Sequence, residues 1–128
     1  MDAEILAFFQ RDPAALELFG ALLEALRVRY PRLEVQPKRT QINLRDGCIF
    51  ACASLPPRRR AADSAIKLML TLCLRSRLDS PRAFQSVEPH PGRWTHHFLL
   101  RTADDLDAEM LEWIDDAHEY AVERSVRR

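Results

Sequence analysis

The residues best suited to metal binding or nucleophilic catalysis are the four histidines and three cysteines of this 128-residue chain. His96 and His97 are adjacent, and adjacent side chains of a strand point to opposite faces, so one metal ion cannot easily bind both. Cys48 and Cys52 lie four residues apart in an expected strand, on one face and about 13 Å from each other, too far to hold one zinc ion. We therefore expect structural histidines and buried, unreactive thiols, Cys73 included, and no metal or cofactor.

Other motifs that carry chemistry are missing from the sequence. Four serines lack the sequence context of a nucleophile elbow: Ser54, Ser64, Ser76 and Ser80. The three glycines, Gly20, Gly47 and Gly92, are not spaced as a phosphate-binding loop. The acidic residues near the end of the chain could form a metal or acid–base site, but a solvated helix face accounts for them: Glu109, Glu112, Asp115, Asp116 and Glu119. We predict no catalytic residue, and an enzyme is the least favoured class.

The charge of the chain is balanced overall but divided along its length. Residues 1–30 carry three basic and five acidic side chains, a net charge of −2. Residues 31–101 carry thirteen basic and five acidic side chains, a net charge of +8, and residues 102–128 carry three and nine, a net charge of −6. The basic middle part either attracts the acidic end within the fold or faces an anionic partner.

Nucleic-acid binding is one interpretation of the basic middle part, because arginine binds phosphate through paired hydrogen bonds. The basic residues expected in loops and at polar strand positions are Lys38, Arg39, Arg45, Arg58, Arg59, Arg60, Arg75, Arg77, Arg82 and Arg93. Of these, Arg58, Arg59, Arg60, Arg75 and Arg77, with Trp94 as a base-stacking ring, are the nucleic-acid candidates. The sequence pI of 6.9 argues against this interpretation, and a solvated surface with some arginines paired to the acidic helix is favoured over it.

Three segments have the apolar spacing of helices. Residues 2–10 form a short one, and residues 13–29 a longer one that begins after Asp12-Pro13 and ends before Pro31. Residues 102–123 form the third, with Thr102 as its N-cap and an apolar stripe that runs from Leu106 to Ala121.

Between the second and third helices the apolar residues alternate, which indicates strands. We predict them at residues 33–36, 42–45, 48–55, 65–74, 83–87 and 94–101, with a helix as the competing prediction for 65–74. Asp46-Gly47 predicts a tight hairpin, and residues 89–92 predict a turn. Short connections require antiparallel pairing, so the fold class is α+β: one domain, residues 1–128, with a curved antiparallel sheet of five or six strands and the three helices on one face.

The uncovered face of such a sheet offers a surface for a protein partner or an anionic ligand. Strand parity places Lys67, Thr71, His97 and Arg101 on it, and Lys38 and Arg39 flank the hairpin beside it. These six residues are the predicted ligand-binding set. The function predicted here is a non-enzymatic binding or accessory module of unknown ligand, with nucleic-acid binding as the alternative.

No apolar run approaches the roughly 18–20 residues of a membrane span. The first residues, MDAEILAFFQRD, lack the basic start of a signal peptide. We therefore expect a cytoplasmic protein with no membrane partner.

Two segments resemble the domain-of-unknown-function family 5655. RWTHHFLLRTADDLDAEMLEWIDDAHEYA, residues 93–121, is similar to the strand, acidic step and helix at the carboxyl end of that family. PKRTQINLRDGCIFACASLPPRR, residues 37–59, resembles its middle hairpin, with Lys38 as the lysine before the first hairpin strand. The resemblance implies a small bacterial α+β domain, similar in layout to DNA-binding-like domains and found appended to larger proteins, nuclease-like ones included. The family has no established activity, so the resemblance carries over no catalytic residue.

Overall fold

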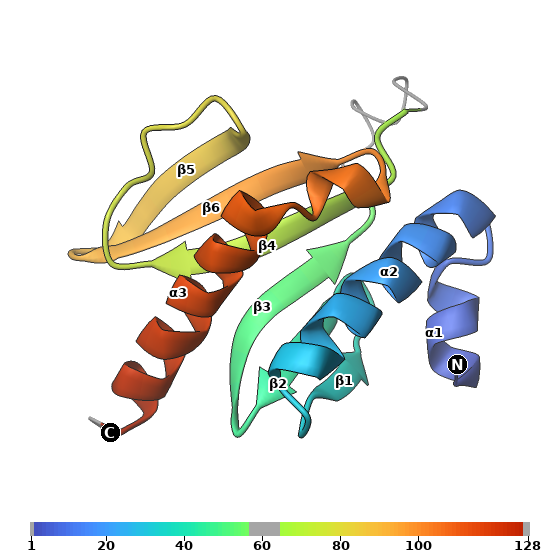
Figure 1. Cartoon of the computed structure of the whole chain (residues 1–128), viewed down its shortest axis with the longest axis horizontal. Coiled ribbons are helices and arrows are strands. Elements are labelled where there is room, and N and C mark those ends of the chain that lie inside the picture. The colour runs from blue at the N-terminus through green and yellow to red at the C-terminus, as the bar shows by residue number, and fades with distance from the viewer. Residues whose placement is uncertain (1, 57–64, 127–128) are drawn as a thin grey trace.

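The computed structural model of the chain describes residues 2–56 and 65–126, which form two helices, six strands, a short 3₁₀-helix and a third helix (Figure 1). In chain order these are α1 (Ala3–Phe8), α2 (Pro13–Arg29), β1 (Glu34–Pro37), β2 (Ile42–Asp46), β3 (Cys48–Ser54), β4 (Leu68–Leu74), β5 (Ala83–His90), β6 (Arg93–Leu100), η2 (Ala103–Asp105) and α3 (Ala108–Val126). The predicted α+β class is confirmed.

All six strands belong to one antiparallel sheet with the order β1-β2-β3-β4-β6-β5. β6 therefore pairs with β4, and β5 lies at the edge of the sheet. The helices α2 and α3 lie over the same face of the sheet (Figure 1), which we call the helix-covered face; the opposite one is the open face.

The core lies between the helices and the sheet. β4 shows the alternation most clearly, since the side chains of Leu68, Leu70, Leu72 and Leu74 are buried and those between them are half-buried. α2 contributes a run of leucines and Phe19, and α3 contributes a stripe at three- and four-residue spacing: Met110, Ile114, Ala117 and Ala121. Each buried leucine contributes about 1.5–3 kcal/mol of transfer free energy, so this layer holds the strands in register.

The helix starts follow the capping side chains. Asp12 Oδ1 accepts a hydrogen bond from Ala15 N at 3.1 Å, and Pro13 occupies the first turn of α2, as predicted. The prediction of one helix from Thr102 is wrong in its first turn. Asp105 bonds back to the Thr102 N–H and closes η2, and α3 starts afresh after Asp107, whose Oδ1 accepts from Met110 N at 3.0 Å.

Two strand boundaries also differ from the prediction. The strand predicted at residues 65–74 begins only at Leu68, although the Lys67 N–H still donates to the Leu100 carbonyl at 2.9 Å. β5 continues to His90 through Pro89, which an edge strand tolerates because one side of its backbone needs no donor. The β5–β6 turn is therefore shorter than predicted.

The two hairpin turns each depend on a glycine. The predicted Asp46-Gly47 hairpin is confirmed, with Asp46 paired to Cys48 and Gly47 at φ +74°. Gly92 also has φ +74° and joins β5 to β6. Residues with a Cβ atom are strained at such angles.

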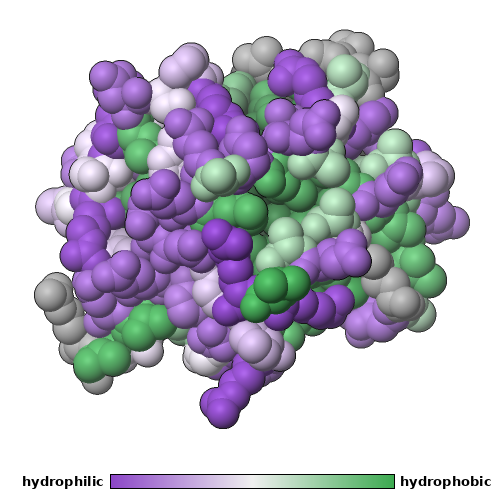
Figure 2. Space-filling view, in the orientation of Figure 1, coloured by the Kyte–Doolittle hydropathy of each residue, from purple (hydrophilic) through white to green (hydrophobic). Residues whose placement is uncertain are grey.

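The surface that Figure 2 shows is divided in character. Hydrophilic side chains dominate the half in which α3 lies, whereas apolar side chains gather toward α2. Among the helices of the described residues, none has both the length and the apolar composition needed to cross a membrane.

Candidate functional site

The candidate site is created by a bulge in β3. Leu44 of β2 pairs with Ala51, but the next residue, Arg45, pairs with Ile49, so Phe50 is an extra residue in β3. Phe50 and Ala51 are both buried as a result. A bulge of this kind bends its strand and increases the local twist.

An aromatic cluster holds the bulge in place. The centroid of the Phe50 ring lies 5.0 Å from that of Tyr30 and 5.0 Å from that of His118. The Tyr30 and His118 rings are stacked, with 4.3 Å between their centroids. Because Tyr30 ends α2 and His118 lies in the middle of α3, the cluster joins both long helices to β3.

Hydrogen bonds fix the two partners of Phe50. His118 Nε2 lies 2.8 Å from Asp46 Oδ2 in the β2–β3 hairpin. The Tyr30 hydroxyl donates to Asp115, and burial together with this bond raises the pKa of Tyr30 well above its usual range. Tyr30 therefore stays a neutral donor.

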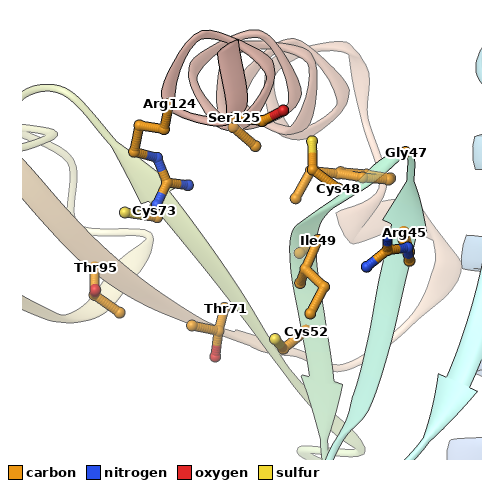
Figure 3. Close-up of a pocket in the computed structure, with 13 residues that line it drawn as sticks. Arg45, Gly47, Cys48, Ile49, Cys52, Thr71, Cys73, Thr95, Arg124 and Ser125 are labelled. Atoms are coloured by element: carbon orange, nitrogen blue, oxygen red, sulfur yellow. The ribbon is translucent and has the colours of Figure 1, made fainter. Parts of the chain in front are cut away.

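Beyond the bulge, β3 and β4 separate. Their pairing runs from Ala51 opposite Leu72 to Ser54 opposite Met69, and it does not continue to Phe50 and Cys73. The space between the diverging strands is a hollow of about 520 Å³ under the last turns of α3 (Figure 3). We call it the split. Its volume falls in the range of small-molecule sites.

The split carries positive charge and hydroxyl groups. Arg45 of β2 and Arg124 of α3 both line it, as do Thr71, Thr95 and Ser125. In Figure 3 the Arg124 side chain points toward β4, and the Arg45 side chain lies beside β2. Within the described residues neither arginine forms an ion pair with an acidic side chain. Two guanidinium groups with free charge favour an anionic ligand.

Arg124 is held in position by Tyr120. Its guanidinium carbon lies 4.8 Å from the centre of the Tyr120 ring, and the Tyr120 hydroxyl donates to the Gly92 carbonyl at 2.8 Å. The Nε–H of Arg124 is buried and finds no acceptor in the described part of the chain. A buried donor without an acceptor costs free energy that a bound anion would recover.

All three cysteines line the split, which corrects two predictions. Each is half-buried rather than buried. Cys48 and Cys52 do not share a face: the extra residue at Phe50 reverses the alternation, so Cys48 packs against the core and Cys52 lies on the open face, as Figure 3 shows. Burial raises the pKa of the Cys52 thiol, which keeps it protonated and weakly nucleophilic.

On the open face, a row of polar side chains crosses the strands next to the split. The register places Asn43, Cys52, Thr71 and His97 opposite one another on four successive strands. Thr71 Oγ1 lies 2.9 Å from His97 Nδ1, and the Cys52 thiol donates to Asn43 Oδ1 at 3.4 Å. Burial lowers the pKa of His97, so its ring is neutral at pH 7 and suited to hydrogen bonding.

The predicted ligand-binding residues divide between two places. Thr71 and His97 are in contact near the split. Lys67 and Arg101 continue the β4–β6 register at the opposite end of these strands, about 13 Å from Thr71. The exposed Lys38 and Arg39 lie at that same end, in the β1–β2 connection.

The predicted pairing of arginines with the acidic helix is confirmed. Arg75 forms a salt bridge with Glu123, and Arg82 contacts both Asp107 and Glu109 at 2.9 Å. Of the other nucleic-acid candidates, Arg77 is exposed and Trp94 is half-buried opposite Leu74, while Arg58, Arg59 and Arg60 lie outside the described residues.

The predicted geometry of the adjacent histidines is confirmed. His96 is fully buried on the helix-covered face, where its Nε2 accepts from Leu78 N at 2.9 Å, and His97 lies on the open face. In residues 2–56 and 65–126, no three histidine, cysteine, aspartate or glutamate side chains are grouped so that they could hold a metal ion.

Comparison with known proteins gives one match. A family model described as Domain of unknown function (DUF5655) matches residues 7–121 of the chain. The matched range includes both segments on which the resemblance was based. No match was found among curated proteins or among solved structures.

Proposed function

We propose that this chain, which belongs to the family Domain of unknown function (DUF5655), is a binding module that holds a small organic anion in the split. The observation that carries the proposal is the presence of Arg45 and Arg124 in one hollow, neither of them neutralised by an acidic side chain of the described residues. Thr71, Thr95 and Ser125 supply uncharged donors for the same ligand.

The contrast with the other arginines supports this assignment. Arg75 and Arg82 form salt bridges within the fold, with acidic residues of α3 and of its N-cap. Arg124 lies one residue beyond Glu123 on the same helix but is directed to the split. A hydrogen bond to a charged group contributes about 1.5–3 kcal/mol, so one guanidinium–carboxylate contact accounts for roughly a tenfold to hundredfold change in affinity.

The test is a titration of the protein with acetate, benzoate, succinate and phosphate at constant ionic strength. Binding is monitored by proton–nitrogen correlation spectra and by thermal unfolding. We expect shifts in the backbone signals of residues 48–52, 71–73 and 124–125. A ligand at about ten times its Kd should stabilise the fold by about 1.4 kcal/mol.

Arginine variants make the test specific. Arg124→Gln and Arg45→Gln should each weaken binding about tenfold or more, whereas Arg77→Gln removes the same charge from an exposed position outside the split and should have no effect. Equal binding by Arg124→Gln and the unchanged protein, or no response to any of the four anions, would refute the proposal.

A second candidate is nucleic-acid binding at the other end of the sheet. The strand register brings Lys67 and Arg101 to the end that also carries Lys38 and Arg39. We would test it by fluorescence anisotropy with labelled duplex and single-stranded DNA at about 50 and 200 mM salt. Affinity that falls steeply with salt and is weakened by Lys38→Gln would support it, and no binding at the lower salt would exclude it.

A further inference from the structure

The split interrupts hydrogen bonding inside a sheet. β3 lies between β2 and β4, yet only its second half, from Ala51 to Ser54, pairs with β4. The first half, Cys48 to Phe50, lies along the split on one side, and Cys73 lies along it on the other. Both segments are flanked on their far sides by paired strands, β2 and β6 respectively.

Backbone groups of both strands therefore face the split. In an antiparallel strand, alternate residues direct their N–H and C=O groups to opposite neighbours. Hence at least one residue of Cys48–Phe50 and one of Cys73–Leu74 direct both groups into the gap, where the pairing of β3 with β4 has ended. Such groups are strand-pairing positions for an extended chain.

The positive charge lies at the wide end of the same gap. Arg124 and Ser125 belong to the last turns of α3 and lie over the wide end of the gap between β3 and β4 (Figure 3). A ligand that satisfied both features would have a backbone with alternating donors and acceptors and one carboxylate. A guanidinium binds a carboxylate through two parallel hydrogen bonds.

We propose that the anion held in the split is the carboxyl end of an extended peptide, an inference that rests on the proposed function. Its last residues pair with the free edge of β3 at Cys48–Phe50, and its terminal carboxylate meets the guanidinium of Arg124. The half-buried thiols and Ile49 give the peptide side chains a partly apolar lining, which favours small uncharged residues.

The probe is a pool of acetyl-capped tripeptides with alanine first and the last two positions randomised, prepared once with a free carboxylate and once with a carboxamide. Proton–nitrogen spectra of the whole chain are recorded with each pool and, separately, with acetate. We expect the free-acid pool to shift the amide signals of Cys48–Phe50 and Cys73–Leu74 and the Nε–H signal of Arg124, and the carboxamide pool to bind about tenfold more weakly or worse.

Two variants separate the carboxylate contact from general charge. Arg124→Gln should reduce the difference in affinity between the two pools about tenfold, because the guanidinium that meets the carboxylate is gone. Arg77→Gln should preserve the difference, since Arg77 is exposed and does not line the split. The melting temperature of each variant shows that it is folded.

The outcomes distinguish this inference from the function on which it rests. If acetate binds as tightly as the free-acid pool, the split holds a small anion and the peptide inference is wrong. If the two pools bind equally to the unchanged protein, the carboxylate is not recognised and the inference also fails. If none of the small anions binds, the proposed function fails; if the small anions bind and neither pool does, only the peptide inference fails.

Discussion

Replacing Phe50 with alanine should destabilise the fold by about 3–5 kcal/mol, the usual cost of removing a buried aromatic side chain. The Phe50 side chain is only 3% exposed and contacts the rings of both Tyr30 and His118. Each aromatic pair accounts for about 0.5–1.5 kcal/mol beyond simple burial, so Phe50→Leu, which keeps most of the apolar volume, should lose about 1–3 kcal/mol. A domain of this size has a total stability of about 5–15 kcal/mol, so Phe50→Ala should remain folded but with a much lower unfolding midpoint.

The assay is urea unfolding followed by circular dichroism, with Ile49→Ala as the matched control. Ile49 is the neighbouring residue in the bulge but is 42% exposed, so its truncation should cost at least about 2 kcal/mol less than that of Phe50. Phe50→Ala should also weaken anion binding, because the bulge that separates β3 from β4 loses its anchor. A loss below about 1 kcal/mol for Phe50→Ala, or a loss equal to that of Ile49→Ala, would show that the aromatic cluster does not hold the bulge.

Two further predictions concern ionisable groups. Burial lowers the pKa of His96 and of His97 from the ordinary value of 6.5, so the unfolded chain binds more protons below about pH 6.5, and the free energy of unfolding should fall as the pH drops from about 6.5 toward the lower folded-state values. Urea unfolding at about pH 7.5 and 5.5 checks this; His97→Gln should reduce the pH dependence, and an unchanged slope would contradict the assignment. The Met110 N–H, followed by the Arg82 guanidinium, lowers the pKa of Asp107, so its stabilising charge should be lost in acid as the pH falls through that lowered value. Asp107→Ala should lower the melting temperature more than Asp107→Asn, since asparagine still caps α3, and equal losses would show that the cap is unimportant.

Much of the fold could be predicted because the local signals agree with the tertiary structure. Asp12-Pro13 marks the start of α2, and the sustained alternation from Leu68 to Leu74 identifies a strand in spite of the helix propensity of leucine. The misplaced boundaries arose where two signals compete. Thr102 and Asp107 are both good caps, and the hydrogen bonds of Asp105 to Thr102 and of Asp107 to Met110 show that the first closes a separate turn.

The site was less predictable because a bulge leaves no clear mark in a sequence. Strict alternation through β3 assigns Cys48 and Cys52 to one face, and one extra residue at Phe50 is enough to separate them. Arg124 is not among the predicted site residues, since nothing in the local sequence shows that the strands diverge beneath it. The division of charge along the chain predicted that some arginines pair with the acidic helix, and the salt bridge between Arg75 and Glu123 is one such pair.

The position of β5 at the edge of the sheet has a consequence for solubility. An eight-residue edge strand presents unpaired backbone groups that can recruit the edge of another molecule and begin aggregation. The exposed end of β5 carries Glu88 and Pro89. The charge of Glu88 disfavours pairing with the edge of another molecule, and Pro89 has no backbone N–H to donate to such a strand. These two residues act as gatekeepers, and their replacement by valine would convert β5 into a longer continuous edge for intermolecular pairing.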